Sequence, residues 1–179
     1  MGVTFPLLVN LVLNGLVLGT LYFLLASGLS LIFGVMSVLN LAHGALFMWG
    51  AYVGLEAFQR TGNFWLALVA GAVAGALIGV IAEQVTVRFL YGRHLQQILL
   101  TLGLMLVLGE LLQLVWGPTL HRFPVPAFAQ GVTFILDYPF AKYRVLVLAA
   151  GAVVLVGMLL LLHRTKLGII VRAGVENSE

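Results

Sequence analysis

The chain has 179 residues, of which 62% are hydrophobic and 8% charged, with a formal net charge of +3 and a mean hydropathy of +1.13. An ordinary soluble domain carries roughly 25% charged residues, so this composition excludes a water-soluble globular fold. The small, scattered charge gives no reason to expect a nucleic-acid partner. Cysteine is absent, which excludes disulfides, zinc thiolate sites and cysteine catalysis.

Continuous rather than alternating apolar runs favour helices over a membrane β-barrel. We therefore predict an all-α polytopic membrane protein with about five transmembrane helices. Residues 1–55 contain no Asp, Glu, Lys or Arg, and one span needs only about 20 apolar residues, so two spans are expected there, at residues 6–34 and 42–58. No basic residue precedes the first apolar run, which we interpret as a span rather than a cleaved signal peptide.

The junction of these two spans is polar. Such residues are poor partners for lipid and are typical of a turn, a broken helix or a re-entrant segment. The residues concerned are Ser37, Asn40, His43 and Gly44. On a helix, Asn40 and His43 would share a face. A discontinuous helix that lines a transport pathway and a structural turn both remain open, whereas the absence of nearby ligands argues against a metal site.

Three further spans are predicted at residues 64–85, 98–116 and 145–162. A long polar connection, residues 117–144, separates the last two. Within it, VTFILDYPFA alternates apolar and polar groups and predicts a short strand pair, so we expect an ordered segment. A transmembrane bundle over residues 1–163 and a cytoplasmic segment at 164–179 complete the predicted organisation.

Small residues recur at fourfold spacing in two spans. This pattern lets another helix approach closely, although glycine and alanine are also abundant in membrane helices without such a role. The predicted packing positions are Ala67, Gly71, Gly75 and Gly79 in one span and Gly15 and Gly19 in the other.

Two polar side chains inside predicted spans are candidates for the pathway. Glu110 lies toward the outer end of span 98–116, where it either lines a pathway or pairs helices, or simply reaches the interface from the bundle. Asn14 lies one helical turn from Asn10 and turns that side of the first span toward protein.

Five spans place the termini on opposite sides of the membrane. The short basic turn around Arg88 and Arg93 is expected on the cytoplasmic side, because positive charge in short loops favours that side. The long connection at residues 117–144 can be translocated to the outside largely regardless of its charge. We therefore expect the N-terminus outside and the C-terminus in the cytoplasm. No nucleotide-binding loop, HExxH motif or hydrolase triad is present, so we expect no enzymatic activity and no cofactor.

Three stretches resemble one family. NGLVLGTLYFLLASGLSLIFGVMSVLNLAHGALFMWGAY at residues 14–52 is similar to the N-terminal signature of permease subunits from branched-chain amino acid ABC importers, which also include urea and amide permeases. LLTLGLMLVLGELLQLVWG at residues 99–117 resembles the family's fourth span. TKLGIIVRAGVENSE at residues 165–179 resembles its cytoplasmic coupling segment.

This resemblance implies a multi-pass subunit of the bacterial inner membrane, in contact with lipid. Its implied partners are a second homologous permease, two cytoplasmic ATPases and an extracytoplasmic solute-binding protein, for which the connection at 117–144 offers a docking feature. Asn40, His43 and Gly44 fall on the family's residues near the break. The residues that fall on the coupling pattern are Gly168, Arg172, Ala173 and Glu176.

Two departures from the family pattern qualify the resemblance. Asn177 stands where aspartate is usual, which weakens one coupling contact, and the chain stops inside the coupling segment, so we expect a partial chain. A membrane scaffold or assembly subunit and half of a secondary transporter are the alternative functions. The solute, whether branched-chain amino acid, urea or amide, is left open because the binding protein largely selects it.

Overall fold

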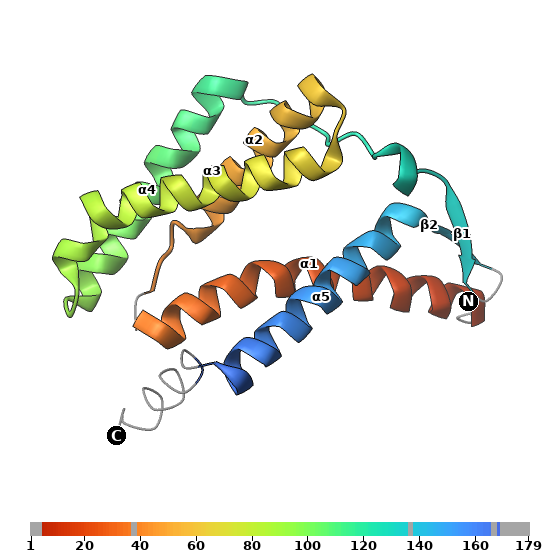
Figure 1. Cartoon of the computed structure of the whole chain (residues 1–179), viewed down its shortest axis with the longest axis horizontal. Helices are drawn as coiled ribbons and strands as arrows, with labels where there is room; N and C mark the ends of the chain where they lie inside the picture. Colours follow the sequence, from red (N-terminus) through yellow and green to blue (C-terminus); the bar gives the residue numbers. More distant parts are fainter. Residues whose placement is uncertain (1–4, 37–38, 136–137, 166–167, 169–179) are drawn as a thin grey trace. The chain divides into compact units, whose positions relative to one another are not determined.

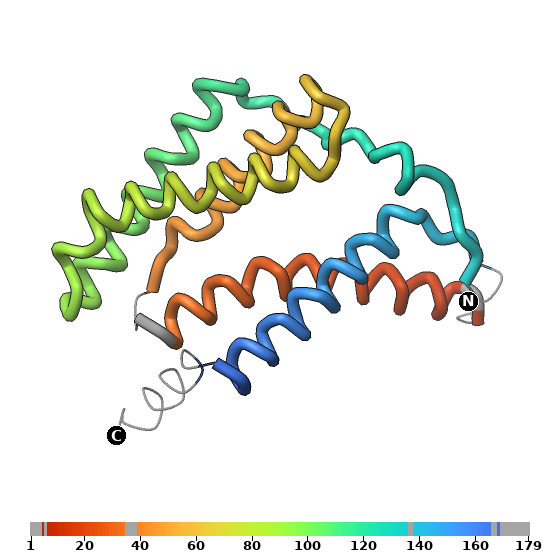
Figure 2. The backbone as a smooth tube through the Cα atoms, in the orientation of Figure 1, coloured from red at the N-terminus to blue at the C-terminus, as the bar shows by residue number. Residues whose placement is uncertain are grey.

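The computed structural model describes residues 5–36, 39–135, 138–165 and 168. Five α-helices account for most of the described chain, and two short 3-10 helices and one two-stranded sheet connect them (Figures 1 and 2). The elements are α1 (Phe5–Met36), α2 (His43–Thr61), α3 (Phe64–Val85), η1 (Val87–Leu90), α4 (His94–Trp116), η2 (Ala127–Ala129), β1 (Val132–Ile135), β2 (Tyr138–Ala141) and α5 (Lys142–Arg164).

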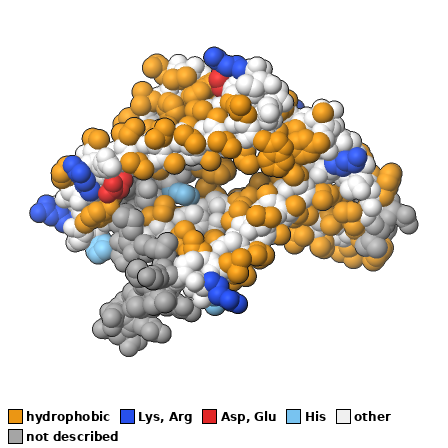
Figure 3. All heavy atoms as spheres, viewed as in Figure 1, with side chains coloured by type: hydrophobic (Ala, Val, Ile, Leu, Met, Phe, Trp, Pro, Cys, Tyr) orange, Lys and Arg blue, Asp and Glu red, His pale blue; other side chains and the backbone are white. Residues whose placement is uncertain are grey.

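Four of these helices are long and apolar enough to cross a membrane, namely α1 over Leu7–Gly34, α3, α4 and α5. Their apolar side chains are largely exposed, and Figure 3 shows them covering the helix surfaces in view. Water would not tolerate so much exposed apolar surface, whereas lipid does. The helix α2 is less apolar, since it begins with His43 and carries the Glu56–Arg60 ion pair (2.7 Å) near its end. The predicted helical polytopic membrane fold is confirmed, with four rather than five helices that qualify as spans by length and composition among the described residues.

The chain divides into two compact units, which we describe separately. One unit, residues 36–123, contains α2, α3, η1 and α4; the other, residues 1–35 with 124–179, contains α1, η2, the sheet and α5.

A tight turn reverses the chain between α2 and α3. Gly62 adopts a left-handed conformation (φ 65°), and its N–H donates to Phe58 O at 2.7 Å, which ends α2. Asn63 then begins α3, because its side-chain oxygen accepts hydrogen bonds from the N–H groups of Trp65 and Leu66 (3.0 and 3.2 Å). The two helices are therefore antiparallel and packed along their length.

Glycine positions make the contact between α2 and α3 close. A Cβ atom placed on Gly50 would lie 2.9 Å from Gly71 O, and one placed on Gly54 would lie 3.0 Å from Ala67 O. Gly75 lies beside Leu46 O and Gly79 beside the Leu46 side chain, at 3.6 and 3.7 Å from their respective added Cβ atoms. The structure thus places all four small residues of α3 against α2.

Aromatic side chains gather where α2 ends, α3 begins and α4 ends. Trp116 contacts the rings of Trp49 and Tyr52, with centroids 5.5 and 5.4 Å apart. Phe123, in the segment after α4, stacks on Phe58 at 5.1 Å. This end of the unit has the composition of a membrane-interface aromatic belt.

In the other unit, the predicted strand pair is present. Strands β1 and β2 are antiparallel, with Val132 opposite Ala141 and Ile135 opposite Tyr138. Lys142 N donates to Gly131 O at 3.1 Å, so the hairpin leads directly into α5. Along α1, the predicted packing positions Gly15 and Gly19 form a notch in the helix surface. Cβ atoms added to these glycines would meet no atom within 4 Å, so no other described helix fills the notch.

Candidate functional site

Residues 39–42, the described part of the junction before α2, are not helical, as expected from the polarity of that junction. Asn40 holds the described part of this break: its side-chain oxygen accepts from Ala42 N (3.0 Å), and its carbonyl oxygen accepts from His43 N (3.2 Å). This is a turn closed by an asparagine side chain. Asn40 lies before α2, so the shared helical face predicted for Asn40 and His43 does not form. Ser37 lies outside the described residues.

Thr101 of α4 makes hydrogen-bonding contacts with the backbone of the break. Its side chain is fully buried, and its hydroxyl oxygen accepts from Leu41 N at 3.3 Å and lies 3.3 Å from Leu39 O. Within α4 the same hydroxyl reaches Gln97 O at 2.9 Å. A single side chain on α4 therefore pairs with backbone groups of the break that have no partner within a helix.

Gln97 lies one turn before Thr101 and is 1% exposed. Its side-chain nitrogen has no hydrogen-bond acceptor among the described residues. Buried amide donors are nearly always paired, so this one calls for a physical explanation. Gln97 and Thr101 are also the largest fully buried side chains of the described chain, and both are polar.

The start of α2 has no side-chain cap and leaves space beside Gly44. His43 and Gly44 are half-buried in the first turn, and a Cβ on Gly44 would meet no atom within 4 Å. No side chain caps this helix at Ala42. The first-turn N–H groups of a helix have no acceptor within it, and they favour a negatively charged or hydrogen-bond-accepting group.

Two other predicted pathway residues lie elsewhere. Asn14 of α1 accepts a hydrogen bond from Arg144 of α5 and donates one to Asn10, so its side chain links two helices of its unit. Glu110 is exposed on α4, and within the described ranges no side chain pairs with it.

Polar residues at the other end of the α3–α4 pair serve the turn between them. Glu83 accepts a hydrogen bond from the Tyr91 hydroxyl at 2.7 Å. Partial burial and this carboxylate together raise the pKa of Tyr91 to about 12, so the phenol remains a donor at physiological pH. Among the described residues, no three His, Asp or Glu side chains come together to hold a metal ion.

The predicted coupling residues fall mostly on a part of the chain that the structure does not describe, since Arg172, Ala173 and Glu176 lie outside the described residues. Gly168 is described, is buried, and donates from its backbone N–H to Thr165 Oγ1 at 3.4 Å.

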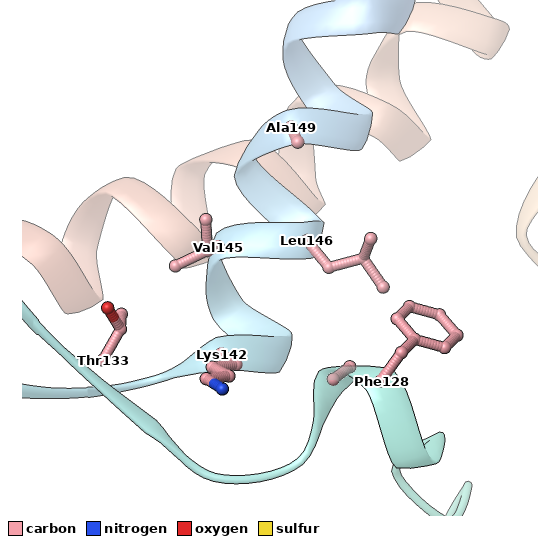
Figure 4. Close-up of a pocket in the computed structure, with 7 residues that line it drawn as sticks. Phe128, Thr133, Lys142, Val145, Leu146 and Ala149 are labelled. Carbon is pink, nitrogen blue, oxygen red and sulfur yellow. The ribbon is translucent and has the colours of Figure 1, made fainter.

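An open groove of about 340 Å³ lies beside the hairpin and the start of α5 (Figure 4). Phe128 and Leu146 face each other across it, and Thr133 and Lys142 supply its polar edge. None of the predicted pathway residues lines this groove.

Sequence reasoning missed Gln97, Thr101 and Arg144. Gln97 and Thr101 are four apart in the sequence, a spacing that indicates a shared polar face on a helix. Gln97 escaped notice because span four was predicted to begin at residue 98, whereas α4 begins one turn earlier, at His94. Nothing in the sequence pairs Arg144 with a residue 130 positions earlier.

The comparisons with known proteins agree on one family. A family model described as "Branched-chain amino acid transport system / permease component" matches residues 11–179. The probable branched-chain amino acid transport permease protein LivH of Methanocaldococcus jannaschii is 30% identical over 94% of this chain and 55% of its own length. The high-affinity branched-chain amino acid transport system permease protein BraD of Pseudomonas aeruginosa is 25% identical over 92% of this chain and 58% of its own length.

A third relative, the LivH permease protein of Escherichia coli K12, is 36% identical over 36% of this chain. No solved structure matches the chain. The chain spans a little over half the length of the first two relatives. Because the family model covers nearly all of it, the chain belongs to the permease component family of branched-chain amino acid transport systems.

Proposed function

We propose that this chain is part of the membrane-spanning permease subunit of an ABC importer, and that it lines the translocation pathway for branched-chain amino acids or a related small polar solute. The proposed pathway residues are Asn14, Ser37, Asn40, His43, Gly44 and Glu110. The protein acts as a transporter and not as an enzyme.

The observation that carries this proposal is the polar break packed against α4. Irregular backbone at membrane depth is tolerated where it is buried in protein or lines a cavity, and transporters place their binding sites at such discontinuous helices. Here the break is held by Asn40 on one side and by Thr101 on the other, while the start of α2 carries no cap.

The position of Asn14 leaves a second role open for that residue. Its hydrogen bond to Arg144 supports helix pairing within its unit, in addition to the proposed pathway role. Glu110 is the more direct candidate, since an exposed carboxylate on an apolar helix needs either water from a pathway or a partner helix.

The partners in this proposal are a second homologous permease, two cytoplasmic ATPases and an extracytoplasmic binding protein. The N-terminus lies outside a bacterial inner membrane and the C-terminus in the cytoplasm. The hairpin and its groove then face the binding protein. Gly168, Arg172, Ala173 and Glu176 form the segment that couples ATPase closure to the bundle.

The test uses the complete permease with its ATPase and binding protein, reconstituted in liposomes. We expect copurification of the ATPase and ATP-dependent uptake of radiolabelled L-leucine. Arg172→Glu should abolish ATPase binding or uptake while membrane insertion is unchanged, and Arg122→Glu, in the connection after α4, is the matched control for ATPase binding and membrane insertion. Insertion without any bound ATPase would favour the scaffold alternative, and uptake driven by an ion gradient without ATP would favour a secondary transporter.

A further inference from the structure

The enclosed side-chain amide of Gln97 is the starting point. A donor that is buried without an acceptor destabilises the state in which it is found, so such groups persist where another state or a ligand uses them. Gln97 is 1% exposed, and no acceptor in the described part of the chain pairs with its Nε2.

The break that Thr101 contacts, one helical turn from Gln97, favours an anionic acceptor. Thr101, one turn along the same side of α4, contacts Leu39 and Leu41, which lie just before the uncapped start of α2. A helix start carries partial positive charge and binds carboxylate or phosphate groups. No Asp or Glu occurs in residues 1–55, so no acidic side chain in the break or the first turns of α2 competes for this donor.

A ligand reaches Gln97 only if the start of α4 moves away from the break. There Thr101 makes two contacts of 3.3 Å, to Leu41 N and Leu39 O, whereas farther along α4 the Trp49 indole N–H donates to Leu108 O at 2.9 Å. Alternating access moves such elements largely as rigid bodies, and this movement would expose the Gln97 amide and the start of α2 together.

We propose that Gln97 contacts the transported solute directly, donating from Nε2 to its carboxylate when α4 separates from the break. This assignment rests on the proposed transport function and adds a solute-contacting residue to it. It selects amino acids over urea, because urea has no carboxylate to receive the bond.

The natural absence of cysteine allows a direct test. In the complete transporter, the thiol introduced by Gln97→Cys should resist a methanethiosulfonate reagent at rest, react during ATP-driven cycling, and be protected at least tenfold in rate by L-leucine. The neighbouring Gln96 is exposed, so a thiol introduced by Gln96→Cys should react in all conditions without protection by leucine.

Uptake provides the second measurement. At saturating leucine-loaded binding protein, Gln97→Leu should lower uptake at least tenfold, the effect of losing one hydrogen bond to a charged group. The unliganded variant should be at least as thermostable as the wild type, because the unpaired donor is gone. Gln96→Leu should transport normally, and Gln97→Met replaces Gln97→Leu if the latter does not assemble.

The outcomes separate the two proposals. A wild-type transporter that does not take up leucine with ATP contradicts the proposed function itself. Normal leucine uptake by Gln97→Leu or Gln97→Met overturns the assignment of Gln97 alone. So does labelling of the thiol at position 97 that leucine leaves unchanged.

Discussion

Two helix pairs in this chain carry small residues at fourfold spacing, yet they are built differently. In the pair α2 and α3, glycines on both helices face each other, and backbone touches backbone at Gly50 and Gly71. In the pair α1 and α5, the contacts come from side chains: Arg144 binds Asn14, and the Thr20 side chain lies against Gly151. Gly15 and Gly19 take no part in that pairing.

The difference teaches that a stripe of small residues predicts a close helix contact only under two conditions. The facing helix must also carry small residues, and the two stripes must be held in register. The turn at Gly62 and Asn63 fixes the register of α2 and α3, since it leaves no free linker between them. Between α1 and α5 the chain is more than 100 residues long, so no local turn sets their register. The side-chain contacts of Arg144 with Asn14 and of Thr20 with Gly151 set the register of α1 and α5 instead.

The largest effect is expected at the backbone contact. In Gly71→Ala the new Cβ would lie 2.5 Å from Gly50 O, so the helices must separate, at a cost of about 1–3 kcal/mol, as for overpacking. Gly75→Ala is the control, because its Cβ would lie 3.6 Å from Leu46 O, an ordinary contact. Unfolding in detergent micelles measures both variants. Equal stability of the two would mean that α2 and α3 are not packed as closely as described.

A smaller effect is expected at the polar contact between α1 and α5. Arg144→Met keeps an unbranched apolar stem and removes the hydrogen bond to Asn14, which should lower the free energy of unfolding by about 1 kcal/mol. Arg122→Met, at an exposed position after α4, is the matched control and should be neutral. If Asn14→Leu added to Arg144→Met lowers stability by the full sum of the two single effects, the residues do not interact.

The smallest effect is expected at the unused notch. Gly19→Ala should leave the stability of the chain unchanged or raise it by less than about 1 kcal/mol, because alanine favours helix and nothing lies within 4 Å of its Cβ. Gly19→Leu should also fold. A loss of stability in Gly19→Ala alone would show that another helix of this chain covers the notch, whereas failure of Gly19→Leu to bind the second permease would place the notch at that interface.

Much of the architecture follows from the sequence, because lipid imposes simple requirements. Long apolar runs must be helices, since an unpaired backbone is too costly in hydrocarbon, and the alternation in VTFILDYPFA identified the hairpin at β1 and β2. The polarity of Asn40 and His43 located the break for the same reason: lipid cannot satisfy such groups, so the chain must turn or be buried there.

The tertiary structure decided which groups meet. Hydropathy and small-residue spacing do not report which face of a helix contacts which neighbour, and so the spacing gave Gly15 and Gly71 the same prediction although only Gly71 is packed. Hydropathy also passed over Thr101, whose hydroxyl supports a break 60 residues away, and Gln97, whose unpaired amide is visible only once burial is known. Burial and pairing depend on contacts between distant segments, and these contacts are formed by the folded chain rather than by any local pattern.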